Sequence, residues 1–131
     1  MFTIERVLIA PAQGALAVQV REDDAGRREA VARLDHAATR AAVESERAVL
    51  HALRGGCSVP AGAYARVEGA SIALDAGVFA PGGDRAIRVQ VTGDAPAETG
   101  ARAAERLLER GAAEILRAVE RSARIGSEAR A

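Results

Sequence analysis

The first third of the chain changes from a strand-like to a helix-like pattern of apolar residues. Small and branched apolar residues run from 15 to 20 with little polar interruption, which predicts a strand. After the acidic turn at 22–24, apolar residues at helical spacing predict a short helix that ends near Asp35. We expect a longer helix from His36 to about Arg54, with Asp35 as its N-cap. The side chains expected on its buried side are Ala38, Ala42, Val49 and Leu53.

Three extended runs follow, and their spacing favours antiparallel hairpins. They cover 63–67, 71–80 and 85–91, and short turn sequences rich in glycine separate them. In the third run every second residue is apolar. We therefore expect one face of this strand to be buried and the other, with Arg88, Gln90 and Thr92, to face water.

The last part of the chain has the pattern of two helices. Asp94 is the expected N-cap of the first, which tolerates Pro96 in its first turn and continues to Gly111. The second is expected from Ala112 to about Arg124, and the tail 126–131 is expected to fray. The buried stripe predicted for the first of these helices is Ala97, Ala101, Ala104 and Leu108.

Segregated strands and helices indicate an α+β fold, with a small three-stranded antiparallel sheet covered on one side by helices. The run at 15–20 has no hairpin partner nearby, so we expect this extra strand and the short helix after it to belong to a neighbouring domain. The predicted organisation is 1–34 as the end of that other domain, 35–125 as the C-terminal domain, and 126–131 as the tail.

Composition and charge exclude several classes of function. Among 131 residues, 18 basic side chains balance 18 acidic ones, so no net field favours nucleic acid or an anionic membrane. Every basic residue is arginine, which excludes lysine chemistry. There is no run of the roughly 20 apolar residues that would span a bilayer, and no secretory leader pattern, so a cytoplasmic protein is expected.

Cys57 is the only cysteine, so it cannot form an internal disulfide, and nothing near it has zinc-ligand spacing. We expect no metal site. Gly55 is predicted to end the preceding helix in a left-handed conformation, and Gly56 adds freedom just before the thiol. Judged from these residues alone, a buried and inert cysteine is the commoner outcome.

Two blocks of sequence carry a resemblance to a known family. The string from Glu46 to Pro60, with its Glu-Arg, Gly-Gly-Cys and Val-Pro elements, resembles the cofactor-attachment signature of porphobilinogen deaminases, also called hydroxymethylbilane synthases. Ala61 departs from the larger aliphatic residue usual there. The block Pro11–Val18 is similar to the segment that returns to the first domain in this family, and Leu107–Leu116 is a third, weaker match.

The resemblance implies a transferase of tetrapyrrole (heme) biosynthesis that condenses four porphobilinogens into hydroxymethylbilane. The growing chain of linear pyrrole intermediates is built on a dipyrromethane, which Cys57 would hold through a thioether. Gln13 matches a position that approaches the cofactor cleft. The family's catalytic carboxylate and substrate-binding arginines belong to its first two domains, so we expect no catalytic residue in this chain and no activity without N-terminal catalytic domains, supplied in cis or in trans.

Two other interpretations remain open. The chain could be a non-catalytic interaction module that self-associates through the unpaired strand at 15–20. An unrelated thiol enzyme that uses Cys57 with His51 is least favoured, because no carboxylate is placed to orient the histidine. Both histidines, His36 and His51, are better explained as solvated side chains, and the acidic run at 22–24 as a turn.

Overall fold

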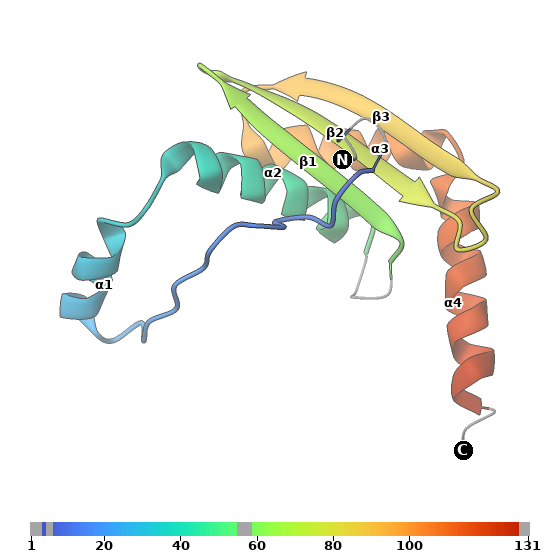
Figure 1. The fold of residues 1–131 in the computed structure, drawn as a ribbon, viewed down its shortest axis with the longest axis horizontal. Helices are drawn as coiled ribbons and strands as arrows, with labels where there is room; N and C mark the ends of the chain where they lie inside the picture. The colour runs from blue at the N-terminus through green and yellow to red at the C-terminus, as the bar shows by residue number, and fades with distance from the viewer. Residues whose placement is uncertain (1–3, 5–6, 55–58, 129–131) are drawn as a thin grey trace.

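The computed structural model describes residues 4, 7–54 and 59–128, with side chains up to residue 122. In chain order its elements are α1 (Ala25–Ala32), α2 (Ala37–Ala52), β1 (Ala61–Glu68), β2 (Ser71–Phe79), β3 (Ala86–Gly93), α3 (Pro96–Glu109) and α4 (Ala112–Glu128). The three strands form one antiparallel sheet in the order β1-β2-β3. Helices α2 and α3 lie against one face of this sheet, as Figure 1 shows. The predicted α+β fold is confirmed.

The core lies between the helices and the sheet, and strand alternation determines which residues enter it. Tyr64, Asp75 and Gln90 are paired across the sheet and lie on the uncovered face, whereas their neighbours on each strand point toward the helices. The wet face predicted for β3 is confirmed. The largest fully buried side chains are Leu74, Leu107, Val49, Val78, Thr99 and Ser45.

The buried stripe predicted for α3 is wrong: the stripe observed is displaced by about one residue around the helix. Ala97, Ala101 and Leu108 are exposed, and of the four only Ala104 is buried. The reason is a close helix contact: a Cβ at Gly100 would collide with the carbonyl oxygen of Ser45 and the methyl of Ala48. Small residues on α3 therefore face α2. The residues that α3 buries are Thr99, Gly100, Ala103, Ala104 and Leu107.

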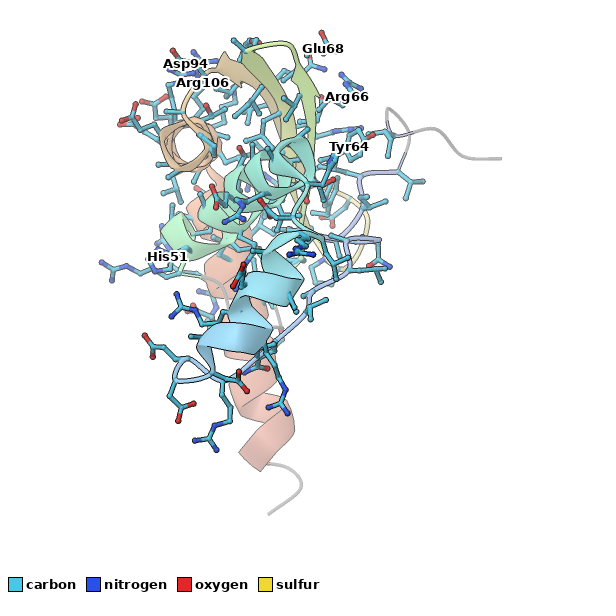
Figure 2. All side chains as sticks on the ribbon, turned by 90° about the vertical axis from the view of Figure 1, so that its left-hand side faces the viewer. His51, Tyr64, Arg66, Glu68, Asp94 and Arg106 are labelled. Atoms are coloured by element: carbon cyan, nitrogen blue, oxygen red, sulfur yellow. The ribbon has the colours of Figure 1, made fainter. Side chains whose placement is uncertain are left out.

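The outer edge of β3 is closed by three arginines on one side of α3. Arg102, Arg106 and Arg110 donate to the backbone carbonyls of Thr92, Gln90 and Arg88 respectively. The arginines are four residues apart on the helix, a rise of about 6.0 Å, and their acceptors are two residues apart on the strand, a rise of about 6.6 Å. The two spacings therefore match over this length. We call these three side chains the arginine ladder. Figure 2 labels Arg106, which lies at α3 next to the sheet.

Two helix caps differ from the prediction. The N-cap of α2 is His36, whose Nδ1 accepts a hydrogen bond from the backbone N–H of Thr39 at 3.3 Å. Asp35 instead pairs with Arg40. Pro96 is the first residue of α3, so the N-cap is Ala95, which has no side chain that could cap the helix. The prediction of Asp94 as the N-cap is therefore wrong.

The end of the chain is more helical than expected, since α4 continues to Glu128 instead of ending near Arg124. Residues 129–131 of the predicted frayed tail lie outside the described part. At its start, α4 is tied to the turn before β3 by a 2.6 Å bond from Arg85 Nη1 to Glu114 Oε2. This bond lowers the pKa of Glu114 below its ordinary value.

The strand expected at 15–20, which was assigned to the sheet of a neighbouring domain, stays a prediction. The segment is extended but pairs with no described strand, and it runs away from the sheet toward α1 in Figure 1. A strand needs a neighbour that pairs with its backbone and covers its apolar side chains. No described strand does this for residues 15–20, and Leu16 is 98% exposed. The short helix that follows does form, as α1, and it buries no residue.

Candidate functional site

The connection between α2 and β1 is the centre of the candidate site, and its two flanks are fixed. Cys57 lies in this connection but outside the described residues, as do Gly55, Gly56 and Ser58. On the helix side, Leu53 is buried and its N–H bonds to the carbonyl of Val49 at 3.0 Å. On the strand side, the N–H of Phe79 in β2 bonds to the carbonyl of Pro60 at 2.9 Å.

Arg54 is the residue that ends α2 in a left-handed conformation, with φ of 53°, and its N–H bonds to the carbonyl of His51. The sequence pattern assigned this role to Gly55, which lies outside the described residues. A non-glycine residue pays a steric cost for this backbone geometry. The chain therefore turns out of the helix one residue earlier than expected, just before the Gly-Gly-Cys sequence.

Gln13 is exposed, on a turn that follows the segment bonded to β1. Its N–H bonds to the carbonyl of Ala10 at 3.1 Å, and Ala12 before it has a left-handed backbone with φ of 64°. Just upstream, the carbonyl of Ile9 accepts the N–H of Ala63 at 3.0 Å. This bond brings the N-terminal segment alongside the outer edge of β1.

Glu46, the first residue of the cysteine signature, is a functional candidate to which the sequence analysis assigned no role of its own. It is only 5% exposed, and its two carboxylate oxygens bind two backbone N–H groups from different parts of the chain. Oε1 accepts from Ala65 in β1 at 2.8 Å, and Oε2 accepts from Ala12 in the N-terminal turn at 2.6 Å. A signal existed, since Glu46 falls on the same side of α2 as Ala42 and Val49, where an apolar residue is expected.

The uncovered face of the sheet carries a polar cluster centred on Asp75. Its Oδ1 accepts a 2.6 Å hydrogen bond from Gln90, and its Oδ2 lies 3.7 Å from Arg66. The guanidinium of Arg66 lies 5.7 Å from the ring centre of Tyr64, and Figure 2 shows both on the side away from α3. The cluster borders a shallow cavity of about 540 Å³. Asp75 is paired with both Gln90 and Arg66, which favours a structural role for the cluster.

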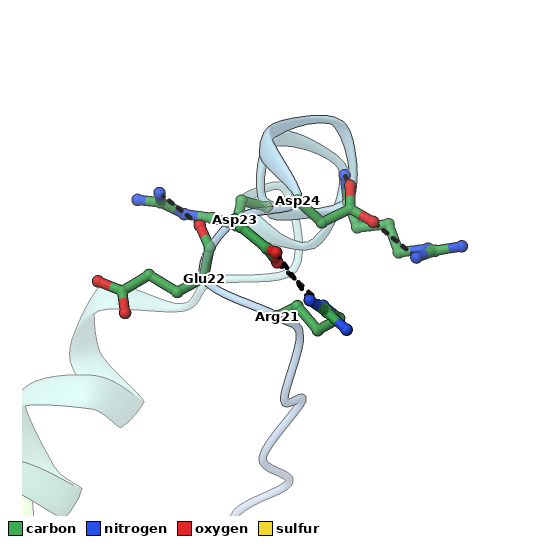
Figure 3. A network of polar contacts seen from close by, with 6 residues as sticks. Arg21, Glu22, Asp23 and Asp24 are labelled. Carbon is green, nitrogen blue, oxygen red and sulfur yellow. Dashed lines mark hydrogen bonds and ion pairs between the residues drawn. The ribbon is translucent and has the colours of Figure 1, made fainter.

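The remaining predicted groups have ordinary roles. His51 is exposed on α2, in agreement with a solvated side chain. The acidic run is a turn, in which Asp24 caps α1 and Arg21 binds Asp23 at 2.7 Å, as Figure 3 shows. The hydrogen bond from Arg21 holds the pKa of Asp23 below its ordinary value. Within the described ranges, no cluster of ligand residues could hold a metal ion, and no described helix is long and apolar enough to span a bilayer.

The fold and the site define a class: a small α+β domain whose single cysteine falls in the connection between a helix and the first strand of an open antiparallel sheet. The sequence model of the family described as porphobilinogen deaminase, C-terminal domain, matches residues 40–109, more than half of the chain. The chain belongs to this family. The matched range includes most of α2, the cysteine-bearing connection, the whole sheet and α3.

Curated relatives agree with this assignment. A porphobilinogen deaminase of Desulforudis audaxviator is 45% identical over 118 residues, which is 88% of this chain and 38% of the relative. The enzyme named so in Xanthomonas campestris pv. campestris is 46% identical over 83% of this chain and 36% of its own length. The one in Nocardia farcinica is 44% identical over 95% and 40%. The chain thus spans between a third and two fifths of these relatives.

Proposed function

We propose that the chain is the cofactor-bearing C-terminal portion of a cytoplasmic hydroxymethylbilane synthase, which joins porphobilinogens into a linear tetrapyrrole. The observation that carries the proposal is the cysteine signature from Glu46 to Pro60, within the region that matches the family's C-terminal domain. The identity of 41–46% to several curated porphobilinogen deaminases supports it.

In this proposal Cys57 is the attachment point of a dipyrromethane. The residues around it suit that task, because two glycines add no bulk beside the thiol and Arg54 before them is exposed. The bonded flanks at Leu53 and Pro60 fix where the connection leaves the domain and returns to it. When bound, the dipyrromethane supplies the pyrrole end to which further units are joined, while the protein's thiol anchors it.

The other parts of the proposed enzyme would come from beyond this chain. The residues that handle protons and bind the substrate's carboxylates are proposed to belong to N-terminal domains, in cis or in trans. Residues 1–34 are proposed to complete a neighbouring domain, which agrees with the exposed apolar side chain of Leu16 and with α1 burying no residue. Gln13 is proposed to approach the cofactor from its turn.

The test asks whether a dipyrromethane becomes attached to Cys57 when the missing domains are supplied as a separate chain. The chain is co-expressed with a second chain that carries the first two domains of a relative, and its intact mass is measured. The expected result is an adduct of one dipyrromethane, together with consumption of porphobilinogen by the mixture but not by the chain alone. The matched control is Cys57→Ser, which should show neither adduct nor activity.

A mixture that associates but gives no adduct on wild-type Cys57 would contradict the proposal. An adduct that persists in Cys57→Ser would assign the attachment to another residue. The alternative of a non-catalytic interaction module is not favoured, because the similarity to named enzymes extends over more than four fifths of the chain.

A further inference from the structure

We propose that Glu46 is a positioning residue, which fixes the turn bearing Gln13 relative to the part of the domain that bears Cys57. The roles of Gln13 and Cys57 rest on the proposed function, but the geometry of Glu46 does not. Its carboxylate is shared between a loop near the start of the chain and the edge of the sheet. One side chain thereby joins three segments that are far apart in the sequence.

Two backbone donors replace water around the buried carboxylate of Glu46. A buried carboxylate is costly unless strong donors replace water, and hydrogen bonds from backbone N–H groups to a charged acceptor are among the stronger ones in proteins. Glu46 has two such bonds, of 2.6 and 2.8 Å. No ion pair among the described residues includes Glu46, so within this part of the chain its carboxylate is held by these two N–H groups.

The contacts of Glu46 reach both sides of the candidate site. Ala12, which donates to Oε2, directly precedes Gln13. Ala65, which donates to Oε1, lies in the strand that begins after the Cys57 connection, and Glu46 itself lies in the helix that ends before it. A change at Glu46 therefore alters the position of the turn relative to the connection.

A second contact keeps the segment on the domain when Glu46 is altered. The carbonyl of Ile9 accepts the N–H of Ala63 at 3.0 Å and does not depend on the carboxylate. Glu46→Gln has nearly the same shape, but its amide offers one acceptor oxygen and turns its NH₂ toward the other N–H. We expect this variant to fold with one of the two bonds lost.

The first experiment measures amide hydrogen exchange by NMR on the 131-residue chain. In the wild type, the amides of Ala12 and Ala65 are expected to be protected. In Glu46→Gln, one of them should exchange about tenfold faster or more, as expected for a lost bond to a charged group, while Leu74 in the central strand is unchanged. The matched control is Glu44→Gln, an exposed glutamate in the same helix.

An unprotected Ala12 amide in the wild type would overturn the proposal without any variant. Equal acceleration at Ala12, Ala65 and Leu74 in Glu46→Gln would also overturn it, because that result means global destabilisation only.

The second experiment tests position itself and uses Cys57 as the only site for a thiol-specific nitroxide label. Paramagnetic broadening of the amides of residues 12–14 then reports how far the turn lies from the labelled cysteine. We expect Glu46→Gln to change this broadening and Glu44→Gln to leave it as in the wild type. Unchanged broadening in Glu46→Gln would overturn the positioning role. Neither measurement needs a bound cofactor, so a failed adduct test would count against the proposed function alone.

Discussion

At the scale of single residues, the end of α2 contains a conformation that its side chain does not favour. Arg54 has φ of 53°, a region where L-residues cost about 1–2 kcal/mol and glycine almost nothing. Arg54→Gly removes this cost, although a freer unfolded chain offsets part of the gain. We predict that the variant raises the free energy of unfolding by roughly 0.5–1 kcal/mol, measured by urea denaturation.

Arg47→Gly is the control for that prediction, because Arg47 is exposed in the middle of the same helix. There glycine should lower the free energy of unfolding by about 1 kcal/mol. A loss of stability in both variants would mean that Arg54 makes a contact worth more than its backbone strain.

At the scale of elements, the arginine ladder predicts the association state of the domain. An exposed strand edge can pair with a second copy, and the ladder covers the carbonyls of Arg88, Gln90 and Thr92 on β3. Replacing Arg102, Arg106 and Arg110 with methionine keeps bulk but removes the donors. We expect this triple variant to form dimers or larger species as its concentration rises, measured by analytical ultracentrifugation.

The control replaces three exposed arginines elsewhere, Arg27, Arg33 and Arg117, with methionine. It changes net charge by the same amount, also adds three methionines at exposed positions, and leaves the edge of β3 covered. Equal association of the two triple variants would show that charge and apolar surface, not the edge, control the outcome.

The elements also show which parts of the fold can be predicted from the sequence. The three strands were predicted because period-two alternation and glycine turns are local signals, and each strand is within two residues of its predicted ends. The buried side of α3 was not predicted correctly, because it depends on the close approach of Gly100 to Ser45. That contact exists only once α2 and α3 are packed together. The strand expected at 15–20 stays a prediction, since it requires a partner strand and the described residues include none for it.

In the candidate site, too, local sequence signals could be predicted and features that depend on packing could not. The cysteine signature could be read directly, because its residues are consecutive in the sequence. Glu46 could be recognised as part of that signature, but its partners Ala12 and Ala65 could not, since they contribute backbone N–H groups that have no side-chain signal. Gln13 and Cys57 as site residues stay predictions.

At the scale of the whole molecule, the segment before α2 contributes little to the core. Leu16 and Leu34 are 98% and 72% exposed, and α1 buries no residue. The contacts in the turn of Figure 3 are exposed hydrogen bonds and ion pairs, and exposed ion pairs add little to stability. The sheet and its helices contain the buried side chains. Residues 15–34 are therefore expected to open locally at much lower free energy than the sheet.

Limited trypsin digestion tests this difference, because arginines occur throughout the chain. We predict first cuts at Arg21, Arg27, Arg28 or Arg33, and a lasting product that retains the sheet and α3, identified by intact mass. Its urea midpoint should be lower than that of the uncut chain, because Glu46 loses the N–H of Ala12 once the N-terminal piece dissociates. In Glu46→Gln the difference between cut and uncut chains should shrink. First cuts at Arg88 or Arg102 would instead place the weakest part of the molecule in the sheet edge, and would contradict this account of where its stability lies.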